Sequence, residues 1–85
     1  MRVLVMGLLA VQIKEVAKAN PDHDIRAWKE GSYRQLRALA QSADVCVVAV
    51  DFSKHRDVRT VEAVGARVLR VSGGAATIAA ALSNL

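Results

Sequence analysis

The sequence predicts an α/β fold in which one parallel sheet lies between two layers of helices. Four short apolar runs alternate with four longer helical segments along the 85 residues. Strands and helices that alternate at this short spacing are typical of right-handed crossovers, and such crossovers produce a parallel sheet. A chain of this length has room for one core, so we expect residues 1–85 to form a single domain.

The first strand and the first helix are bounded by glycine and proline. Residues 2–6 form an apolar run that stops at Gly7, and a helical segment follows over residues 8–19. This helix is predicted to end at residues 20–22, because proline stops a helix and Asn and Asp favour a turn. Residues 24–28 then alternate between polar and apolar, which is typical of a half-exposed strand.

Capping residues mark the limits of the next two helices. Ser32 is the expected N-cap of a helix that runs to about residue 42. The run 44–50 is apolar after its first residue, as expected for a strand covered on both faces. A third helix is predicted over residues 53–64 and ends at Gly65, since glycine is favoured just beyond a helix end.

The fourth strand and the fourth helix complete the domain. Residues 67–71 form the strand, residues 72–74 form a turn, and an Ala-rich helix closes the chain. The first and third strands are the most uniformly apolar and belong in the middle, whereas Arg26, Arg67 and Arg70 place the other two at the edges. The expected strand order is 2-1-3-4, in a three-layer domain of Rossmann-like or flavodoxin-like type. Right-handed connections put the first helix on one face and the second and third on the other, and we expect the last helix beside the first.

Composition narrows the possible functions. The net charge is +4, from 12 Lys and Arg against 8 Asp and Glu, which favours a polyanionic partner. The single cysteine, Cys46, excludes an intrachain disulfide and a Cys-based zinc site, and its apolar neighbours predict a buried, inert thiol. No segment is long enough to span a membrane and no signal peptide is recognisable, so we expect a cytoplasmic protein.

Arginines occupy the predicted outer faces of the second and third helices. At 3.6 residues per turn, the residues that turn toward the sheet are Leu36, Leu39, Ala40, Val58 and Val61. The arginines left on the outside are Arg34, Arg37, Arg56 and Arg59. Part of their charge could be neutralised by Glu30, Asp57 and Glu62, and a solvated helix face is the alternative to a functional one. We expect one basic face that contacts nucleic acid or an acidic protein.

The last helix differs from the others because residues 75–85 carry no charge. It is expected to lie beside the apolar start of the first helix, and an exposed apolar surface of this kind usually marks a partner. A chain this short is also marginally stable as a monomer. We therefore predict a homodimer whose interface consists of Leu8, Leu9, Val11, Ile78, Leu82 and Leu85.

A glycine turn at the carboxyl end of the fourth strand is the candidate ligand site, because open parallel sheets bind ligands beyond these ends. Its residues Ser72, Gly73 and Gly74 precede a helix whose first N–H groups and positive dipole end favour an anion. Three residues that follow the third strand would lie at the same edge: Asp51, Lys54 and His55. The turn would accept a phosphorylated ligand or a nucleotide, unless it is an ordinary connection between strand and helix.

Motifs for cofactor and catalytic chemistry are weak or absent. Large residues follow Gly7, which excludes the G-x-G-x-x-G dinucleotide fingerprint, and the sequence has no P-loop. Asp51, Ser53 and His55 supply a carboxylate, a hydroxyl and an imidazole, but no spacing in the sequence pairs a nucleophile with a base. We expect no cofactor, no metal site and no catalytic residues.

Short motifs spread over residues 28–82 resemble a known family. They are Ala43-Asp44-Val45 at a strand start, Asp51-Phe52 and His55 after that strand, and Arg70-Val71-Ser72-Gly73-Gly74 before the last helix. The pattern is similar to the uncharacterised bacterial family called domain of unknown function 2325, whose members look like small Rossmann-like domains. The resemblance implies that Asp51, His55, Ser72 and Gly73 match the family's motif residues, with Lys54 in place of its serine. It also implies a non-enzymatic or regulatory role.

Together these observations predict a small non-enzymatic binding or regulatory module. We expect it to be dimeric and to contact an anionic partner through its basic helix face. Two alternatives stay open. The first is a sensor that binds a phosphorylated ligand or nucleotide at the carboxyl ends of the strands, and the second is a protein-interaction module that acts through its apolar helices.

Overall fold

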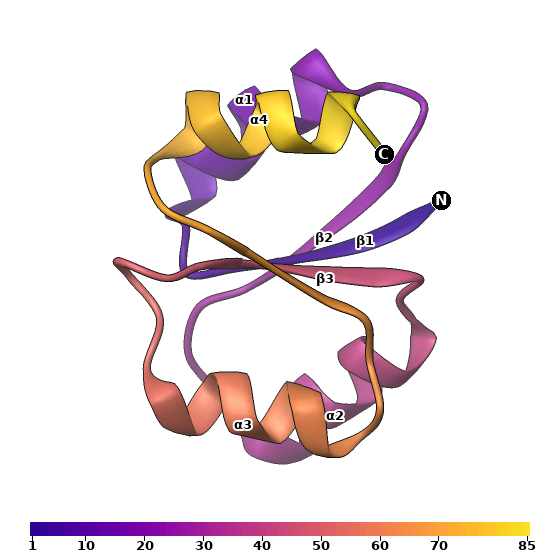
Figure 1. The fold of residues 1–85 in the computed structure, drawn as a ribbon, viewed down its shortest axis with the longest axis vertical. Helices are drawn as coiled ribbons and strands as arrows, with labels where there is room; N and C mark the ends of the chain where they lie inside the picture. The colour runs from indigo at the N-terminus through magenta and orange to yellow at the C-terminus, as the bar shows by residue number, and fades with distance from the viewer.

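Strands and helices alternate along the whole chain in the computed structural model, which describes residues 1–85 (Figure 1). The strands are β1 (Arg2–Met6), β2 (Asp24–Trp28), β3 (Val45–Ala49) and β4 (Val68–Val71). The helices are α1 (Ala10–Ala19), α2 (Tyr33–Ser42), α3 (His55–Ala63) and α4 (Ala75–Ser83). The predicted four strands and four helices are confirmed, with limits that shift by at most two residues. None of the helices is long and apolar enough to cross a membrane.

The sheet has the order β2-β1-β3-β4, and every neighbouring pair of strands is parallel, as the sequence predicts. β1 and β3 occupy the centre because their side chains are apolar on both faces, and every residue of Val45–Ala49 is buried. β2 and β4 lie at the edges, where Arg26 and Arg70 stay exposed. An edge strand has one free side, so it tolerates charged residues that a central strand would bury without partners.

Figure 1 shows the two helical layers on opposite faces of the sheet, α1 with α4 on one face and α2 with α3 on the other. Each layer closes a separate apolar cluster against the sheet. Between α1, α4 and the sheet lie Val3, Val5, Leu8, Val16, Val45, Val47, Ala49, Ala75, Ile78 and Leu82. Between α2, α3 and the sheet lie Leu4, Met6, Trp28, Leu36, Ala40, Cys46, Val48 and Val61. Alternate residues of β1 and β3 therefore enter the two clusters, because successive side chains of a strand point to opposite faces.

The turn after β1 packs tightly against the turn after β3. Gly7 has a φ of +99°, and a Cβ at this position would lie 2.6 Å from Ser53 Oγ. The Ser53 hydroxyl donates a hydrogen bond to Met6 O at 3.3 Å, which links the ends of the two central strands. After this turn the chain is still extended at Leu9, so α1 begins two residues later than predicted.

Asn20, predicted only to help stop the first helix, also ties α1 to α4. Its side chain is buried, and Nδ2 donates hydrogen bonds to Val16 O and Ala79 O, at 3.2 Å each. Ser83 Oγ donates a third bond to Asn20 Oδ1 at 3.0 Å. The ends of two helices that are distant in sequence are thereby joined within one layer.

The single cysteine lies in the central strand β3. Cys46 is fully buried, and burial raises the pKa of its thiol to about 11. A thiol becomes a nucleophile only as the thiolate, so Cys46 is unreactive at neutral pH. This agrees with the predicted inert cysteine.

Candidate anion-binding interface

α2 and α3 carry arginines at corresponding positions. Arg34 and Arg56 are the second residues of their helices, and Arg37 and Arg59 are the fifth. Both helices follow a strand of the parallel sheet and return along the same face, so they lie side by side and point in the same direction (Figure 1). All four side chains are exposed. We call these four residues the arginine face.

Helical periodicity sorts the inner residues of α2 and α3 from the outer ones. Leu36, Ala40 and Val61 are buried, and Leu39 and Val58 pack partly buried against the same cluster. On the outside, a groove of about 410 Å³ lies between the two helices. Its lining residues are Arg37, Arg56, Arg59, Thr60 and Ala63. The structure thus brings three of the four predicted arginines to one groove, and Arg34 lies one helical turn before Arg37 on α2.

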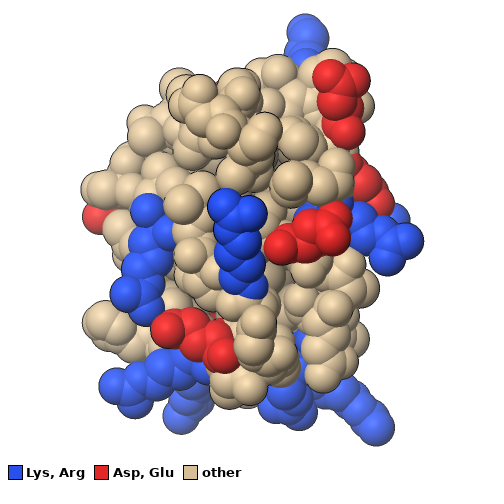
Figure 2. Space-filling view, turned by 45° about the vertical axis from the view of Figure 1, so that its right-hand side comes forward, with Lys and Arg blue, Asp and Glu red and all other residues tan.

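The acidic residues expected to neutralise this charge form no ion pair with it. Glu62 pairs instead with Arg70 of β4, at 2.8 Å. Asp57 is 5% exposed, and Glu30 forms no ion pair. The only other ion pair of the structure lies within β2. The arginine face is therefore unpaired, and Figure 2 shows basic side chains projecting from the end of the molecule where α2 and α3 lie.

Arg56 is held against an aromatic ring. Its guanidinium carbon lies 5.7 Å from the centroid of the Tyr33 ring, within the range of a cation–π contact. The neighbouring Tyr33 side chain raises the pKa of Arg56 above its ordinary value, and the negative charge of Asp57 adds to this effect. The Tyr33 ring in turn lies 6.5 Å from the ring of Trp28, measured between centroids. These contacts join α3 to the start of α2.

The predicted anion cradle after β4 is occupied by a carboxylate of the chain itself. Asp51 Oδ2 accepts a hydrogen bond from Ser72 Oγ at 3.0 Å and another from Gly73 N at 3.1 Å. Gly73 has a φ of +120°, and a Cβ there would lie 2.7 Å from Thr77 Oγ1, so the turn requires glycine. The structure brings these three residues together, with Ser72 and Gly73 both donating to the Asp51 carboxylate. An incoming anion would have to displace a carboxylate that already uses these donors.

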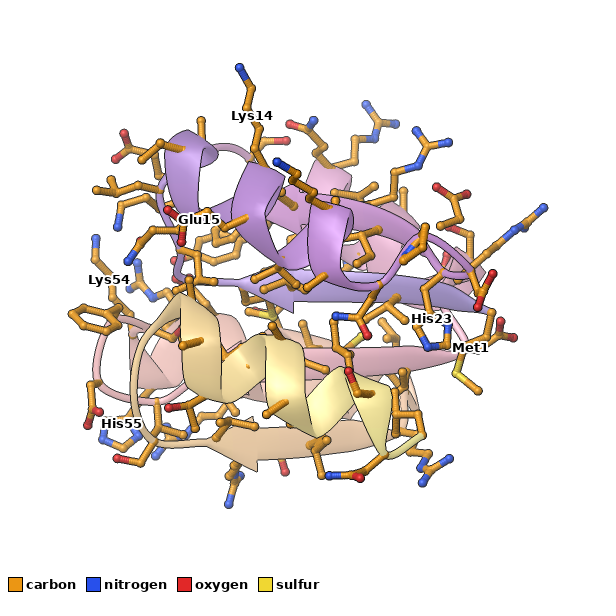
Figure 3. All side chains as sticks on the ribbon, turned by 90° about the horizontal axis from the view of Figure 1, so that it is seen from above. Met1, Lys14, Glu15, His23, Lys54 and His55 are labelled. Atoms are coloured by element: carbon orange, nitrogen blue, oxygen red, sulfur yellow. The ribbon has the colours of Figure 1, made fainter.

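Lys54 and His55 lie at the same edge of the sheet, as the N-cap and the first residue of α3. Figure 3 shows both at one end of the molecule, opposite Met1 and His23. A cavity of about 220 Å³ is lined by Val50, Ser53, His55, Val58 and Arg70, without Lys54 and without Gly74, the N-cap of α4. Because Ser53 donates to Met6 O and Asp51 accepts from Ser72, these side chains form no acid–imidazole–hydroxyl chain with His55.

Half of the predicted dimer interface is buried inside the monomer. Leu8 is 3% exposed, and Ile78 and Leu82 are fully buried, because they fill the cluster between α1, α4 and the sheet. The structure thus corrects the assignment of these three residues to an intermolecular surface. The other three are exposed: Leu9, Val11 and Leu85, at 53%, 62% and 38%. The first two lie at the start of α1 and the third follows the end of α4, so they occupy opposite ends of the layer (Figure 1).

A further cavity, of about 310 Å³, lies at the amino ends of β1 and β2 beside the end of α2, where the sequence predicted no site. Its lining residues are Arg2, Val3, Leu4, Asp24, Arg26, Leu39, Ser42 and Ala43. Two of them, Arg26 and Asp24, pair with each other at 3.3 Å. The only feature of the sequence at this place is the alternation of polar and apolar residues in β2. That pattern indicates an edge strand, but it does not indicate a cavity beside the strand.

The residues of this chain offer no cluster of three or more His, Cys, Asp or Glu side chains that would hold a metal ion. Comparison of the chain with protein-family models, with curated proteins and with solved structures found no match in any of the three. The resemblance to the family called domain of unknown function 2325 is therefore supported only as far as a small α/β fold with four parallel strands. The case for a function rests on the surface of this chain.

Proposed function

We propose that the chain is a small non-enzymatic binding module whose arginine face contacts the phosphates of a nucleic acid. The observation that carries this proposal is the groove between α2 and α3, where Arg37, Arg56 and Arg59 converge and none of them forms an ion pair. Arginine presents a planar fork of donors that matches the oxygens of a phosphate group, and it stays charged at physiological pH.

The arrangement of the arginine face favours a partner with regularly repeated charge. Residues three apart on a helix are separated by about 4.5 Å along its axis, and neighbouring helices pack about 8–10 Å apart. Arg34 and Arg37 thus form one row, and Arg56 and Arg59 form a second row beside it. A nucleic acid backbone offers its charges in a continuous series, so it can meet both rows at once. An acidic protein is the competing partner.

The first test is the fluorescence anisotropy of labelled duplex and single-stranded DNA at low and at physiological salt. Binding through the arginine face should weaken as salt is added, with a log–log slope of about −0.9 for each phosphate contacted on duplex DNA. The decisive variant replaces Arg34, Arg37, Arg56 and Arg59 with Ala. It should abolish binding and leave the fold intact, because all four side chains are exposed.

A matched control removes the same charge from other surfaces. Its four positions are Arg2, Lys14, Lys18 and Arg67, which are exposed, form no ion pair and lie outside α2 and α3. Replacing them with Ala lowers the net charge equally and should weaken binding only modestly. Equal losses in the two variants would show that the attraction is non-specific. If polyglutamate binds at low salt and DNA does not, the partner is an acidic protein.

The two other predicted functions have less support. The turn after β4 is a weaker anion site, since the Asp51 carboxylate already accepts from Ser72 Oγ and Gly73 N. An interaction module that acts through its apolar helices is less well supported, because Leu8, Ile78 and Leu82 are buried in the core of the monomer and cannot contact a partner.

A homodimer remains part of the proposal, through the exposed apolar start of α1. Leu9 and Val11 are the side chains available there. Pairing two copies would place two arginine faces on one particle and raise its affinity for a long nucleic acid. Val11→Glu should then shift the mass measured by light scattering from dimer to monomer. A wild-type protein that is monomeric at high micromolar concentration would contradict the dimer.

A further inference from the structure

Two of the three aromatic residues of the chain meet at one end of the arginine face. Trp28 ends β2 and is 6% exposed, and Tyr33 begins α2 and is partly exposed. Their ring centroids are 6.5 Å apart, with the ring planes inclined by 34°. Arg56 of α3 lies over Tyr33, with 5.7 Å between its guanidinium carbon and the ring centroid. The three side chains therefore form a column that extends from the core to the surface.

Arg56 is the outermost member of this column and is exposed, whereas Tyr33 is partly buried and Trp28 is buried. The guanidinium carbon of Arg56 lies 5.7 Å from the centroid of the Tyr33 ring. The side chain is exposed, so the guanidinium has a face open to solvent. Nucleobases stack on guanidinium planes as they do on aromatic rings. A base stacked on Arg56 would therefore extend the contact that the guanidinium already makes with the Tyr33 ring.

The same residue also lines the groove between α2 and α3, together with Arg37 and Arg59. The contact between Arg56 and Tyr33 is the only cation–π contact of the structure. Arg56 thus lies between the groove, which could hold phosphates, and the Tyr33 ring, beside which a base could stack. A nucleic acid strand whose phosphates contact Arg37 and Arg59 can stack a base on Arg56 only if one face of that base is free.

We infer that the arginine face takes single-stranded rather than double-stranded nucleic acid, with one unpaired base stacked on the Arg56–Tyr33 pair. This inference rests on the proposed function and specifies its ligand. In a duplex both faces of an internal base are covered by its neighbours, so a base reaches the pair only by leaving the helix. In a single strand the bases are free to stack on side chains, and this stacking adds to the charge contacts of the backbone.

The test compares a labelled oligothymidylate of about 16 nucleotides with a duplex of the same length, at the same low salt. The wild-type protein should bind the single strand roughly tenfold more tightly. Arg56→Lys keeps the charge and removes the planar group. It should weaken single-strand binding by roughly fivefold to a hundredfold and change duplex binding little.

Arg59→Lys is the matched control, because it makes the same chemical change one turn further along α3, away from the Tyr33 ring. It should change the affinities for single strand and duplex to a similar, small extent. Tyr33 supplies a second pair of variants. Tyr33→Phe keeps the ring and should retain most of the preference for the single strand, whereas Tyr33→Leu should lose it. Circular dichroism checks that each variant is folded.

The inference is overturned if the wild-type protein binds duplex as tightly as single strand. It is also overturned if Arg59→Lys lowers the preference as much as Arg56→Lys does, or if Arg56→Lys and Tyr33→Leu both leave the preference unchanged. In each of these cases, binding that still requires the four arginines leaves the proposed function standing. If the wild-type protein binds neither nucleic acid at low salt, the proposed function itself fails.

Discussion

The two helical layers of this domain bury their inner faces in the same way and differ on the outside. The α1–α4 layer closes a cluster of aliphatic side chains, and α4 carries no charged residue. The α2–α3 layer closes a cluster of similar size that includes Trp28 and Cys46, and its outer surface carries four arginines without ion pairs. Both layers therefore use their inner residues to close the core, and the outer residues distinguish the layers.

The largest expected effect tests whether the two clusters contribute equally to stability. Ile78→Ala in α4 and Leu36→Ala in α2 each truncate a fully buried aliphatic side chain. Each should lower the free energy of unfolding by about 2–5 kcal/mol, through lost burial and the cavity left behind. Urea denaturation measures both variants. A loss several times larger in one of them would show that one layer dominates the stability of the sheet.

The pH dependence of the free energy of unfolding distinguishes the two clusters, because only the α2–α3 cluster holds a titratable side chain, Cys46. Burial raises the pKa of Cys46 from 9.0 to about 11, so the folded state holds the thiol proton more tightly than the unfolded state. The resulting stability is complete below pH 9 and is lost between pH 9 and about 11, by up to about 1.4 kcal/mol per pH unit. Cys46→Ala should remove this component. Identical pH slopes for the variant and the wild type would contradict it.

A third prediction concerns the hydrogen bonds inside the α1–α4 layer. Asn20→Ala leaves Val16 O and Ala79 O without their buried donor and should lower the free energy of unfolding by about 1–3 kcal/mol. Asn84→Ala is the control, since it removes only an exposed bond to Ala80 O and should cost less than about 0.5 kcal/mol. Thermal denaturation compares the two. Equal losses would mean that the tie between α1 and α4 adds nothing to the stability of the layer.

The smallest effect is expected at the start of α4. Asp51→Ala removes the acceptor for Ser72 Oγ and Gly73 N and should cost about 0.5–2 kcal/mol, as the loss of a helix cap does. It also frees these donors, so inorganic phosphate should raise the Tm of the variant and not that of the wild type. A phosphate-dependent rise in the wild type would instead favour the ligand-sensor alternative.

Much of the architecture could be predicted because the sequence contrasts central with edge strands. Arg26 and Arg70 mark the edges, and the uninterrupted apolar residues of β3 mark the centre. Periodicity also placed the arginines outside, since Leu36 and Val61 define the buried stripe of their helices. The same reasoning did not identify the buried face of α4. A helix that is apolar on all sides has no alternation of polar and apolar residues to indicate which side packs against the sheet.

The finer geometry of the candidate sites depends on distances between elements. The strand order places Asp51 and Gly73 at one edge of the sheet. It does not show that the Asp51 carboxylate accepts a hydrogen bond from Gly73 N. Arg56 and Tyr33 meet because α2 and α3 pack side by side, and the side-chain conformations that bring them into contact are set by packing. A sequence pattern predicts which residues share a surface and leaves their mutual contacts open.

Ser53 bridges the carboxyl ends of the two central strands, β1 and β3, at a boundary that we call the seam. In the order β2-β1-β3-β4, the chain leaves β1 and β3 toward opposite sides, and open sheets of this kind receive their ligands in the crevice where this divergence occurs. Here the Ser53 hydroxyl spans the seam to Met6 O, and Gly7 packs directly against it. A hydroxyl group of the chain itself therefore bridges the seam. A molecule that approaches the boundary between β1 and β3 meets the Ser53 side chain, and the cavity of about 220 Å³ at this edge lies on the β3 side, between Ser53, His55 and Arg70.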